Sequence, residues 1–296
     1  MGRGCQEGTS QTLILNKPLI RSHDLLTREL PPIQWDVHPL ISRGDRVVVF
    51  GEFGSFKSWI LLHLGWHLAV AKTWLDTFTI PDPRKVLYVD EEMNERTLRR
   101  RGKRLAMGAN ITGDPGMAFL SRAGVRFDAY GASTLLAYLN TQKFTPQVVI
   151  VEAMRRVLIG DENEAKDLAA FWRNLEPISR LGITFIISHH MSKPPMEGKR
   201  NLRYRASGST DILAGSDASF AVERLSEGMA RITGIKARDD VELKPFTVKL
   251  DDNGDRQGPV TLTPVLTGTP AGPARRLSPG EVKDVFALPA PGTRQS

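Results

Sequence analysis

The stretch from Val47 to Leu64, which reads VVVFGEFGSFKSWILLHL, constrains the fold of this chain more than any other segment. The apolar residues 47–50 predict a short buried strand, and the apolar run that begins after Ser58 predicts a helix. A turn with glycines at positions 51 and 54 joins the two. The free backbone N–H groups of such a turn, and the positive end of the helix that follows, bind anions. The segment therefore predicts an α/β fold with an anion site at the end of a strand.

The turn follows the phosphate-binding pattern G-x-x-x-x-G-K-[ST] with one departure. Gly51, Lys57 and Ser58 match the pattern, but Phe56 stands where the second glycine belongs. In this pattern the lysine reaches the β and γ phosphates and the hydroxyl ligates Mg²⁺. If the position before the lysine needs a positive φ, a non-glycine residue there costs roughly 1–2 kcal/mol. A chance glycine-rich turn is the alternative. The predicted nucleotide-binding residues are Gly51, Glu52, Phe53, Gly54, Ser55, Phe56, Lys57, Ser58 and Trp59.

Composition and charge limit the class of protein. With 296 residues and 41% hydrophobic content, the chain is long enough for one large α/β domain. Its single cysteine, Cys5, excludes a disulfide framework, which suits a cytoplasmic protein. We expect no membrane segment, because no run approaches the ~18 apolar residues of a spanning helix. The formal net charge of +7 permits a nucleic acid partner without establishing one.

Three acidic residues follow a strand predicted at 85–89. Asp90, Glu91 and Glu92 lie at its carboxyl end, where α/β sheets place their ligand sites. Crowded like charges are expected to raise one another's pKa, which makes one of the three a candidate general base for activating water. The alternative is that they cap the helix predicted at 94–105. The two roles are compatible.

A fourth acid ends the apolar run at 147–151, a run typical of a central parallel strand. Glu152 thus occupies the place where P-loop enzymes hold Mg²⁺ or its water with a carboxylate, usually an aspartate. The longer glutamate can still act through water. The alternative is an acid in an ordinary loop. We predict that Ser58 and Glu152 hold the metal.

Histidines occur in two pairs. His189 and His190 follow the strand predicted at 183–188, where a polar side chain can respond to the γ-phosphate. Neighbouring strand residues point to opposite faces, so a joint metal site is disfavoured and one phosphate-sensing histidine is preferred. His63 and His67 stand four apart on the predicted helix at 59–73, but no further ligand accompanies them, and we expect no metal there.

Two segments are rich in basic residues. The helix at 94–105 carries six cations, for which a solvated face is the first interpretation and contact with nucleic acid or a neighbouring subunit the second. The loop at 193–205, KPPMEGKRNLRYR, has Tyr204 among its cations. It suits binding of a nucleic acid backbone with base stacking, and flexible disorder is the equal alternative.

The remaining pattern completes an α/β architecture. We predict helices at 22–30, 133–142 and 165–181, a strand at 117–120, and antiparallel strands at 229–235 and 246–250. The expected fold is a mostly parallel central sheet flanked by helices, with antiparallel strands at its C-terminal edge. The predicted organisation is an N-terminal extension at 1–30, a nucleotide-binding domain at 31–262, and a Pro- and Gly-rich, disordered tail at 263–296.

Four features, in this order and spacing, resemble the RecA-like ATPases of the plasmid RepA helicase type, which include AAA family ATPases of phage and mobile elements. They are the phosphate-binding turn at Gly51, the acid with methionine at 92–93, the acid at Glu152, and the histidine pair with a lysine at 189–193. The segment ASGSTDILAGSDASF is also similar to that family's RGSS-x-I-x-x-x-x-D. The resemblance covers about residues 30–250.

The resemblance implies a role for each matched residue. Lys57 and Ser58 would bind phosphate and Mg²⁺, Glu92 would be the catalytic glutamate, Glu152 the Walker B carboxylate, and His189 or His190 the sensor. Arg205, Lys236 and Arg238 resemble cations that reach a neighbouring subunit's nucleotide in RecA-like rings. A cation supplied in this way can raise the rate ~10³–10⁵-fold, so hydrolysis would depend on assembly.

The sequence therefore predicts an ATPase that uses ATP and Mg²⁺, assembles as a homo-oligomer, a hexameric ring, and acts on single-stranded DNA. A replicative helicase or helicase-like motor of a plasmid, phage or mobile element is the preferred interpretation. One alternative is a nucleotide-gated DNA-binding or helicase-loading protein with slow hydrolysis, which Phe56 makes plausible. Another is a monomeric P-loop phosphotransferase.

Overall fold

The computed structural model describes residues 19–29, 31–190, 211–237 and 243–265. The chain divides into two units, residues 1–33 and 34–296. In the first unit the described residues form α1, Ser22–Thr27, which is shorter than the helix predicted at 22–30. The residue after α1, Arg28, is already extended, as expected for a chain that approaches the prolines at 31 and 32.

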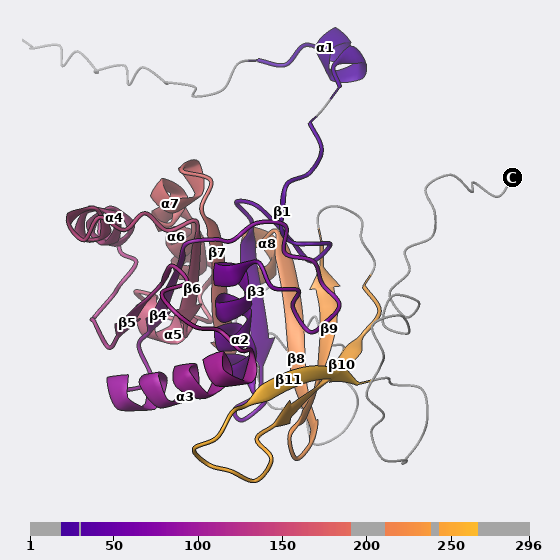
Figure 1. Cartoon of the computed structure of the whole chain (residues 1–296). Helices are drawn as coiled ribbons and strands as arrows, with labels where there is room; N and C mark the ends of the chain where they lie inside the picture. The colour runs from indigo at the N-terminus through magenta and orange to yellow at the C-terminus, as the bar shows by residue number, and fades with distance from the viewer. Residues whose placement is uncertain (1–18, 30, 191–210, 238–242, 266–296) are drawn as a thin grey trace, which may run out of the picture. The chain divides into compact units, whose positions relative to one another are not determined.

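A nine-stranded sheet forms the centre of the second unit as far as it is described (Figure 1). The strand order is β11-β10-β9-β8-β3-β7-β6-β4-β5. The strands from β8 to β5 in this order pair in parallel, and β8 to β11 pair antiparallel. This confirms the predicted fold. The strands are β3 Arg46–Gly51, β4 Val86–Asp90, β5 Met117–Ser121, β6 Val148–Glu152, β7 Thr184–His190, β8 Ala218–Ser226, β9 Met229–Lys236, β10 Phe246–Asp251 and β11 Thr261–Val265.

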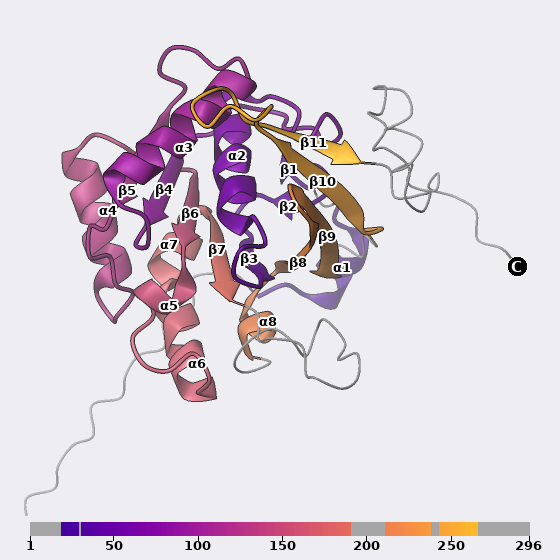
Figure 2. The ribbon, with the colours of Figure 1, turned by 90° about the horizontal axis from the view of Figure 1, so that it is seen from below.

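Helices cover both faces of the parallel strands, and Figure 2 shows α2 and α3 on one side with α5 and α6 on the other. The alternation of side chains along β4 explains this arrangement. Val86 and Tyr88 are buried in the core that includes α2 and α3, whereas Leu87 and Val89 join the core beneath α4 to α8. Both faces of the strand are therefore apolar. The helices of this unit are α2 Lys57–Val70, α3 Glu95–Gly108, α4 Gly131–Thr141, α5 Met154–Val157, α6 Ala165–Asn174, α7 Glu176–Arg180 and α8 Asp211–Gly215; a small antiparallel pair, β1 Trp35–Val37 and β2 Ile41–Ser42, precedes β3.

The structure corrects two sequence predictions. The single helix predicted at 165–181 is two helices, α6 and α7, because Pro177 at the start of α7 has no N–H to continue the first helix. Strand β11 was not predicted, and it extends to Val265, past the predicted domain end at 262. Pro264 is tolerated in β11 because the strand lies at the edge of the sheet. The rest of the predicted tail, 266–296, lies outside the described residues.

The parallel register brings the tips of four strands to one edge of the sheet. Gly51 at the end of β3 pairs with His190 at the end of β7, and Asp90 of β4 pairs with Glu152 of β6. The backbone N–H of Glu91 also donates to the carbonyl of Glu152 at 2.8 Å. The residues predicted to bind nucleotide and metal therefore meet at the carboxyl edge, as the topology of such sheets requires.

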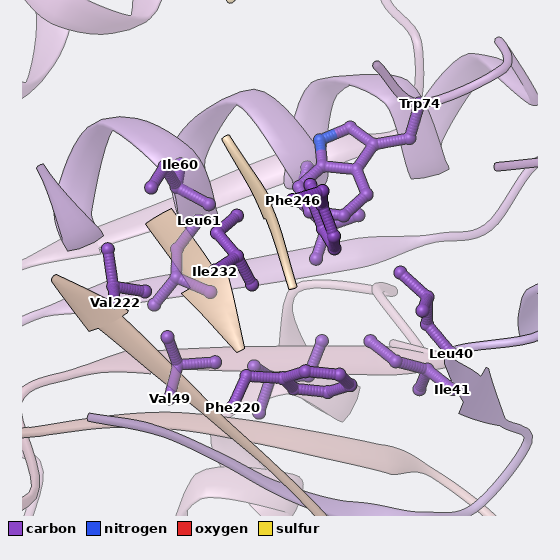
Figure 3. A pocket seen from close by; sticks show the side chains of 12 residues that line it. Leu40, Ile41, Val49, Ile60, Leu61, Trp74, Phe220, Val222, Ile232 and Phe246 are labelled. Atoms are coloured by element: carbon purple, nitrogen blue, oxygen red, sulfur yellow. The ribbon is translucent and has the colours of Figure 1, made fainter. Parts of the chain in front are cut away.

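A small apolar cavity lies in the core between α2 and the sheet (Figure 3). Its volume is about 30 Å³, and Val49, Ile60, Phe220, Val222 and Ile232 are among the side chains that surround it. The walls carry no polar side chain other than the indole of Trp74. The packing here leaves room for roughly one additional methyl group.

Two substitutions test the packing around this cavity. We expect Ile60→Ala to lower the free energy of unfolding by about 3 kcal/mol, because it removes buried atoms and enlarges the void. We expect Val222→Ile to stay within about 1 kcal/mol of the wild type, because the void accepts the added methylene. Urea unfolding at equilibrium measures both. A large loss of stability for Val222→Ile would show that the void is not there.

Candidate functional site

The phosphate-binding turn connects β3 to α2 with a left-handed backbone at two positions. Gly54 has φ 76°, and Phe56 has φ 69° and ψ 11°. The position before the lysine therefore does need a positive φ. A Cβ on Gly51 would lie 2.3 Å from the carbonyl oxygen of Val222, so only glycine fits where the turn passes β8.

The aromatic ring of Phe56 has contacts that offset part of its backbone strain. The ring is half-buried and packs against the core that includes α2. The guanidinium of Arg224, on β8, lies 5.3 Å from the ring centroid in a cation–π arrangement. An exposed contact of this kind contributes about 0.5–1 kcal/mol. The phosphate-binding turn thus keeps its expected shape without its second glycine.

Lys57, the first residue of α2, is buried with its ammonium inside the turn. Its Nζ donates to the carbonyl oxygens of Gly51, at 2.7 Å, and Glu52, at 2.9 Å. Burial lowers the pKa of Lys57, and the carboxylate of Glu152 opposes this shift. A buried cation surrounded by the N–H groups of a helix N-terminus binds anions, which fits the phosphates of a nucleotide.

Ser58 and Glu152 are in direct contact, and both are suitable ligands for Mg²⁺. The Ser58 hydroxyl donates to Glu152 Oε2 at 3.0 Å. Within the described part of the chain, the buried atoms Glu152 Oε1 and Asp90 Oδ2 have no hydrogen-bond partner. Burial raises the pKa of Glu152 to about 7, and the nearby Asp90 adds to the shift.

A hard cation fits these oxygens better than any other group. Mg²⁺ is usually held by one or two carboxylates together with substrate phosphates, and it needs no larger cluster. Accordingly, the described residues contain no group of three or more His, Cys, Asp or Glu side chains placed to hold a metal. Ser58 and Glu152, the residues that we predict to hold Mg²⁺, lie together here, and the ion would supply charge neutralisation of the phosphates.

The three acids after β4 have three different surroundings. Asp90 Oδ1 accepts hydrogen bonds from the backbone N–H groups of Glu92, at 2.9 Å, and Met93, at 2.6 Å. The carboxylate of Glu91 accepts the N–H groups of residues 124 and 125, at 3.2 and 2.9 Å. Neither caps the next helix, since Asn94 does so by accepting from the N–H of Thr97. Glu92 is the remaining acid of the three, and its carboxylate faces His190 at the carboxyl edge of the sheet.

The carboxylate of Glu92 lies between two groups that can carry positive charge. Its Oε1 is 3.8 Å from Nε2 of His190 and 3.9 Å from Nε of Arg156. The interaction with His190 lowers the pKa of Glu92, whereas burial raises that of Asp90. The expectation that all three acids raise one another's pKa is therefore wrong for Glu92. An ionised carboxylate here is able to accept a proton.

The two histidines of β7 point to different surroundings, as their adjacent positions predicted. His190 is half-buried beside Glu92. His189 is fully buried, and its Nδ1 lies 3.8 Å from Oε2 of Glu162. His190 is thus the histidine that meets the predicted catalytic edge. His63 and His67 are buried on α2; Nδ1 of His63 accepts from the indole N–H of Trp74, and His67 contacts the carbonyl of Thr73, so both have structural partners.

The predicted intersubunit cations are only partly described. Lys236 Nζ donates to the carbonyl oxygens of Leu213 and Ser216, both at 2.6 Å, so its ammonium binds the end of α8 in its own chain. Its assignment to a neighbour's nucleotide stays a prediction. Arg205 and Arg238, and the basic loop at 193–205, lie outside the described residues. Trp59 is half-buried with the guanidinium of Arg101 5.0 Å from its ring.

Sequence reasoning missed Arg122, which follows β5. Its Nε and Nη2 both donate to the carbonyl oxygen of Glu92, at 3.0 and 2.6 Å. Its own N–H donates to the carbonyl of Asp90 at 2.7 Å. The sequence offered one signal for Arg122: it is a cation that directly follows a strand predicted to end at the ligand edge. The sequence did not indicate that it would bind a backbone carbonyl.

The comparisons with known proteins agree with this geometry. A family model described as AAA domain matches residues 15–196. The chain belongs to the AAA domain family. It is a P-loop ATPase with a RecA-like fold, as the sequence predicted.

One solved structure supports the fold. The chain is similar to a KaiC-like protein from the hyperthermophilic archaeon Pyrococcus horikoshii OT3, with 12% identity, a TM-score of 0.51, and coverage of 78% of this chain and 94% of that one. The flagellar accessory protein FlaH from Methanocaldococcus jannaschii gives 13% identity, a TM-score of 0.46, and coverage of 71% and 86%. No functionally curated protein matches the sequence. Among the described helices of this AAA domain protein, none is long and apolar enough to cross a membrane.

Substitution of Phe56 tests the strain in the phosphate-binding turn. Phe56→Ala and Phe56→Gly both lose the ring contacts, but only the alanine keeps a Cβ in the left-handed conformation. We therefore expect Phe56→Gly to be more stable than Phe56→Ala by about 1 kcal/mol, the reverse of the usual order of these residues. Urea unfolding of the two variants measures the difference. An alanine variant as stable as the glycine variant would contradict the strained backbone.

The pH dependence of stability tests the buried acid. Because the pKa of Glu152 is about 7 in the folded chain and 4.5 ordinarily, folding takes up a proton between these values. The stabilisation from this proton is complete below about pH 4.5 and is lost as the pH rises through 7. Across this window we expect wild type, without nucleotide, to lose up to about 3 kcal/mol relative to Glu152→Gln. Urea unfolding at several pH values measures this; parallel pH profiles for the two proteins would refute it.

Proposed function

We propose that this protein hydrolyses Mg-ATP between the subunits of a hexameric ring and couples the reaction to single-stranded DNA. The setting we propose is a replicative helicase or helicase-like motor of a plasmid, phage or mobile element. One observation carries the nucleotide chemistry: Lys57 and Ser58 at the start of α2, Glu92 just after β4 and Glu152 at the end of β6 meet at a single sheet edge. The basic residues and the sequence resemblance support the DNA partner.

The residues at this edge support a specific division of work. Lys57 and the N–H groups at the start of α2 bind the β and γ phosphates, while Ser58 and Glu152 hold the magnesium ion. Glu92, which is ionised, accepts a proton from the water whose oxygen attacks the γ-phosphorus. The bond from the γ-phosphorus to the bridging oxygen breaks as the new bond forms, and the products are ADP and phosphate.

His190 connects this chemistry to the rest of the chain. Its imidazole contacts the carboxylate of Glu92, and it is the last residue of β7, next in sequence to the basic segment predicted to bind DNA. We propose that His190 responds to the γ-phosphate and passes its presence to that segment. Arg205, Lys236 and Arg238 are the proposed cations for a neighbouring subunit's nucleotide. Lys236 would have to leave the carbonyl groups of residues 213 and 216 to act in this way.

A slower, nucleotide-gated DNA-binding or helicase-loading protein is the second candidate. Two observations favour it: Phe56 occupies a strained position in the turn, and burial raises the pKa of Glu152 to about 7. A carboxyl with a raised pKa is a weaker metal ligand near neutral pH, because metal binding needs its ionised form. A forked DNA duplex separates the candidates, because only the motor unwinds it.

ATP hydrolysis with and without single-stranded DNA tests the proposed function. We expect DNA to raise the turnover of the wild type at least several-fold, and we expect Lys57→Ala, the blank, to abolish turnover, because the ammonium that binds the phosphates is gone. Size-exclusion chromatography with light scattering, with and without ATP, measures assembly in parallel. A strict monomer with DNA-independent turnover would contradict the ring and would favour a small-molecule phosphotransferase.

A further inference from the structure

A second cavity lies beside the loop that joins β5 to α4, apart from the phosphate-binding turn. It has a volume of about 550 Å³, which is large enough for a ligand of drug or nucleobase size. Leu120, Val125 and Leu135 form apolar walls, and Tyr130 and Tyr138 line it from the start and the middle of α4. We name this cavity the tyrosine groove.

The two tyrosines are unusual because their rings are in solvent. The exposed fraction is 77% for Tyr130 and 46% for Tyr138. Tyr130 is the residue just before α4 and Tyr138 lies in the second half of that helix, eight residues further along, which corresponds to roughly 12 Å at the helical rise. Two exposed aromatic rings at this separation can each stack on a different base of an unpaired strand.

The surface around the tyrosine groove supplies positive charge. Arg122 and Arg126 are exposed on the loop itself. The loop is tied to α5, since the N–H of Phe127 donates to the carbonyl of Val157 at 2.8 Å, and α5 carries the exposed Arg155 and Arg156. Of the acids nearby, Asp128 accepts the N–H of Tyr130 and Glu91 accepts N–H groups of the loop. Arg126 lines the groove itself and, among the described residues, donates to the carbonyl of Val125 and not to an acid, so its charge is available to a phosphate.

The same loop is hydrogen-bonded to the segment that carries Glu92. Arg122 has φ 49°, a strained value for a residue with a side chain, and it donates twice to the carbonyl of Glu92. In return, the Glu91 carboxylate accepts the N–H groups of residues 124 and 125. The hydroxyl of Ser121 donates to the carbonyl of Met93 at 2.9 Å. One wall of the groove and the segment of the proposed base thus form one connected unit.

We propose that the tyrosine groove binds two bases of a single-stranded nucleic acid, and that Arg122 is a positioning residue that transmits this binding to Glu92. The inference rests on the proposed function and deepens it by naming where the strand is read. Apolar walls with two exposed aromatic rings suit bases, and the surrounding arginines suit the phosphates that join them.

Binding is tested with the full-length chain and a fluorescein-labelled 20-nucleotide oligo(dT), by anisotropy. Because each tyrosine stacks on one base, we expect Tyr130→Ala and Tyr138→Ala each to weaken binding roughly tenfold. Tyr130→Phe and Tyr138→Phe keep the rings and are expected to bind like the wild type. Arg126→Ala should weaken binding and reduce its salt dependence, whereas Arg180→Ala, an exposed arginine on α7, is the matched control without effect. A labelled oligo(rU) of the same length identifies whether DNA or RNA is preferred.

Transmission is tested with Arg122→Lys, which keeps the charge but cannot donate twice from a planar group. We expect its affinity for oligo(dT) to stay within twofold of the wild type, while the kcat of DNA-stimulated hydrolysis falls about tenfold at an unchanged KM for ATP. A role in stability alone would not separate kcat from KM in this way.

The failures of the two proposals are distinguishable. If the wild type binds oligo(dT) and is stimulated by it, but the tyrosine-to-alanine variants match the wild type, the groove is not the site and the proposed function stands. A wild type that binds no oligonucleotide overturns both. Equal stimulation of Arg122→Lys and wild type overturns the transmission through Arg122.

Discussion

The contact between Ser58 and Glu152 is the constraint on which the rest of the site depends. It joins the first turn of α2 to the tip of β6, so the phosphate-binding turn and the metal-binding acid cannot be placed independently. Glu152, Asp90 and Lys57 are all buried there, and isolated buried charges are costly. The surrounding apolar strands hold these groups at the edge in spite of the cost. A site kept in this way is already organised for a metal and a phosphate, which would neutralise charges that the protein alone leaves poorly compensated.

Phe56 shows how a phosphate-binding turn tolerates the loss of its second glycine. The turn still needs a positive φ at this position, so Phe56 takes a left-handed conformation at a cost of roughly 1–2 kcal/mol. Burial of part of the ring against the core and the cation–π contact with Arg224 offset part of this cost. The arginine comes from β8, the strand that also passes within contact of Gly51. Contacts with the neighbouring strand β8 therefore help to maintain the shape of the turn. A glycine at this position would adopt the same shape without such contacts.

Much of the fold and of the site follows from the sequence, and the rest depends on contacts between distant segments. Apolar runs marked the central strands, and the rule that parallel strands share a carboxyl edge predicted that Lys57, Glu92, Glu152 and a histidine would meet. The break before Pro177 was visible in the sequence and was not used. Strand β11 was not predicted because its segment adjoins residues whose Pro- and Gly-rich composition is typical of a disordered tail. The separate tasks of Asp90, Glu91 and Glu92 depend on which backbone N–H groups face each carboxylate, and no local pattern specifies that.

Glu92, the proposed base, is held by contacts that differ from those of the residues proposed to bind the nucleotide. The residues proposed to bind phosphate and metal lie at the start of α2 and at the end of β6. Glu92 is instead held from three other places: Asp90 binds its N–H, Arg122 binds its carbonyl, and His190 contacts its carboxylate. Arg122 is exposed on the loop after β5 and His190 is the half-buried end of β7, whereas Asp90 is buried at the end of β4. A partner that moves one of them changes the position of the proposed base while leaving the affinity for ATP intact.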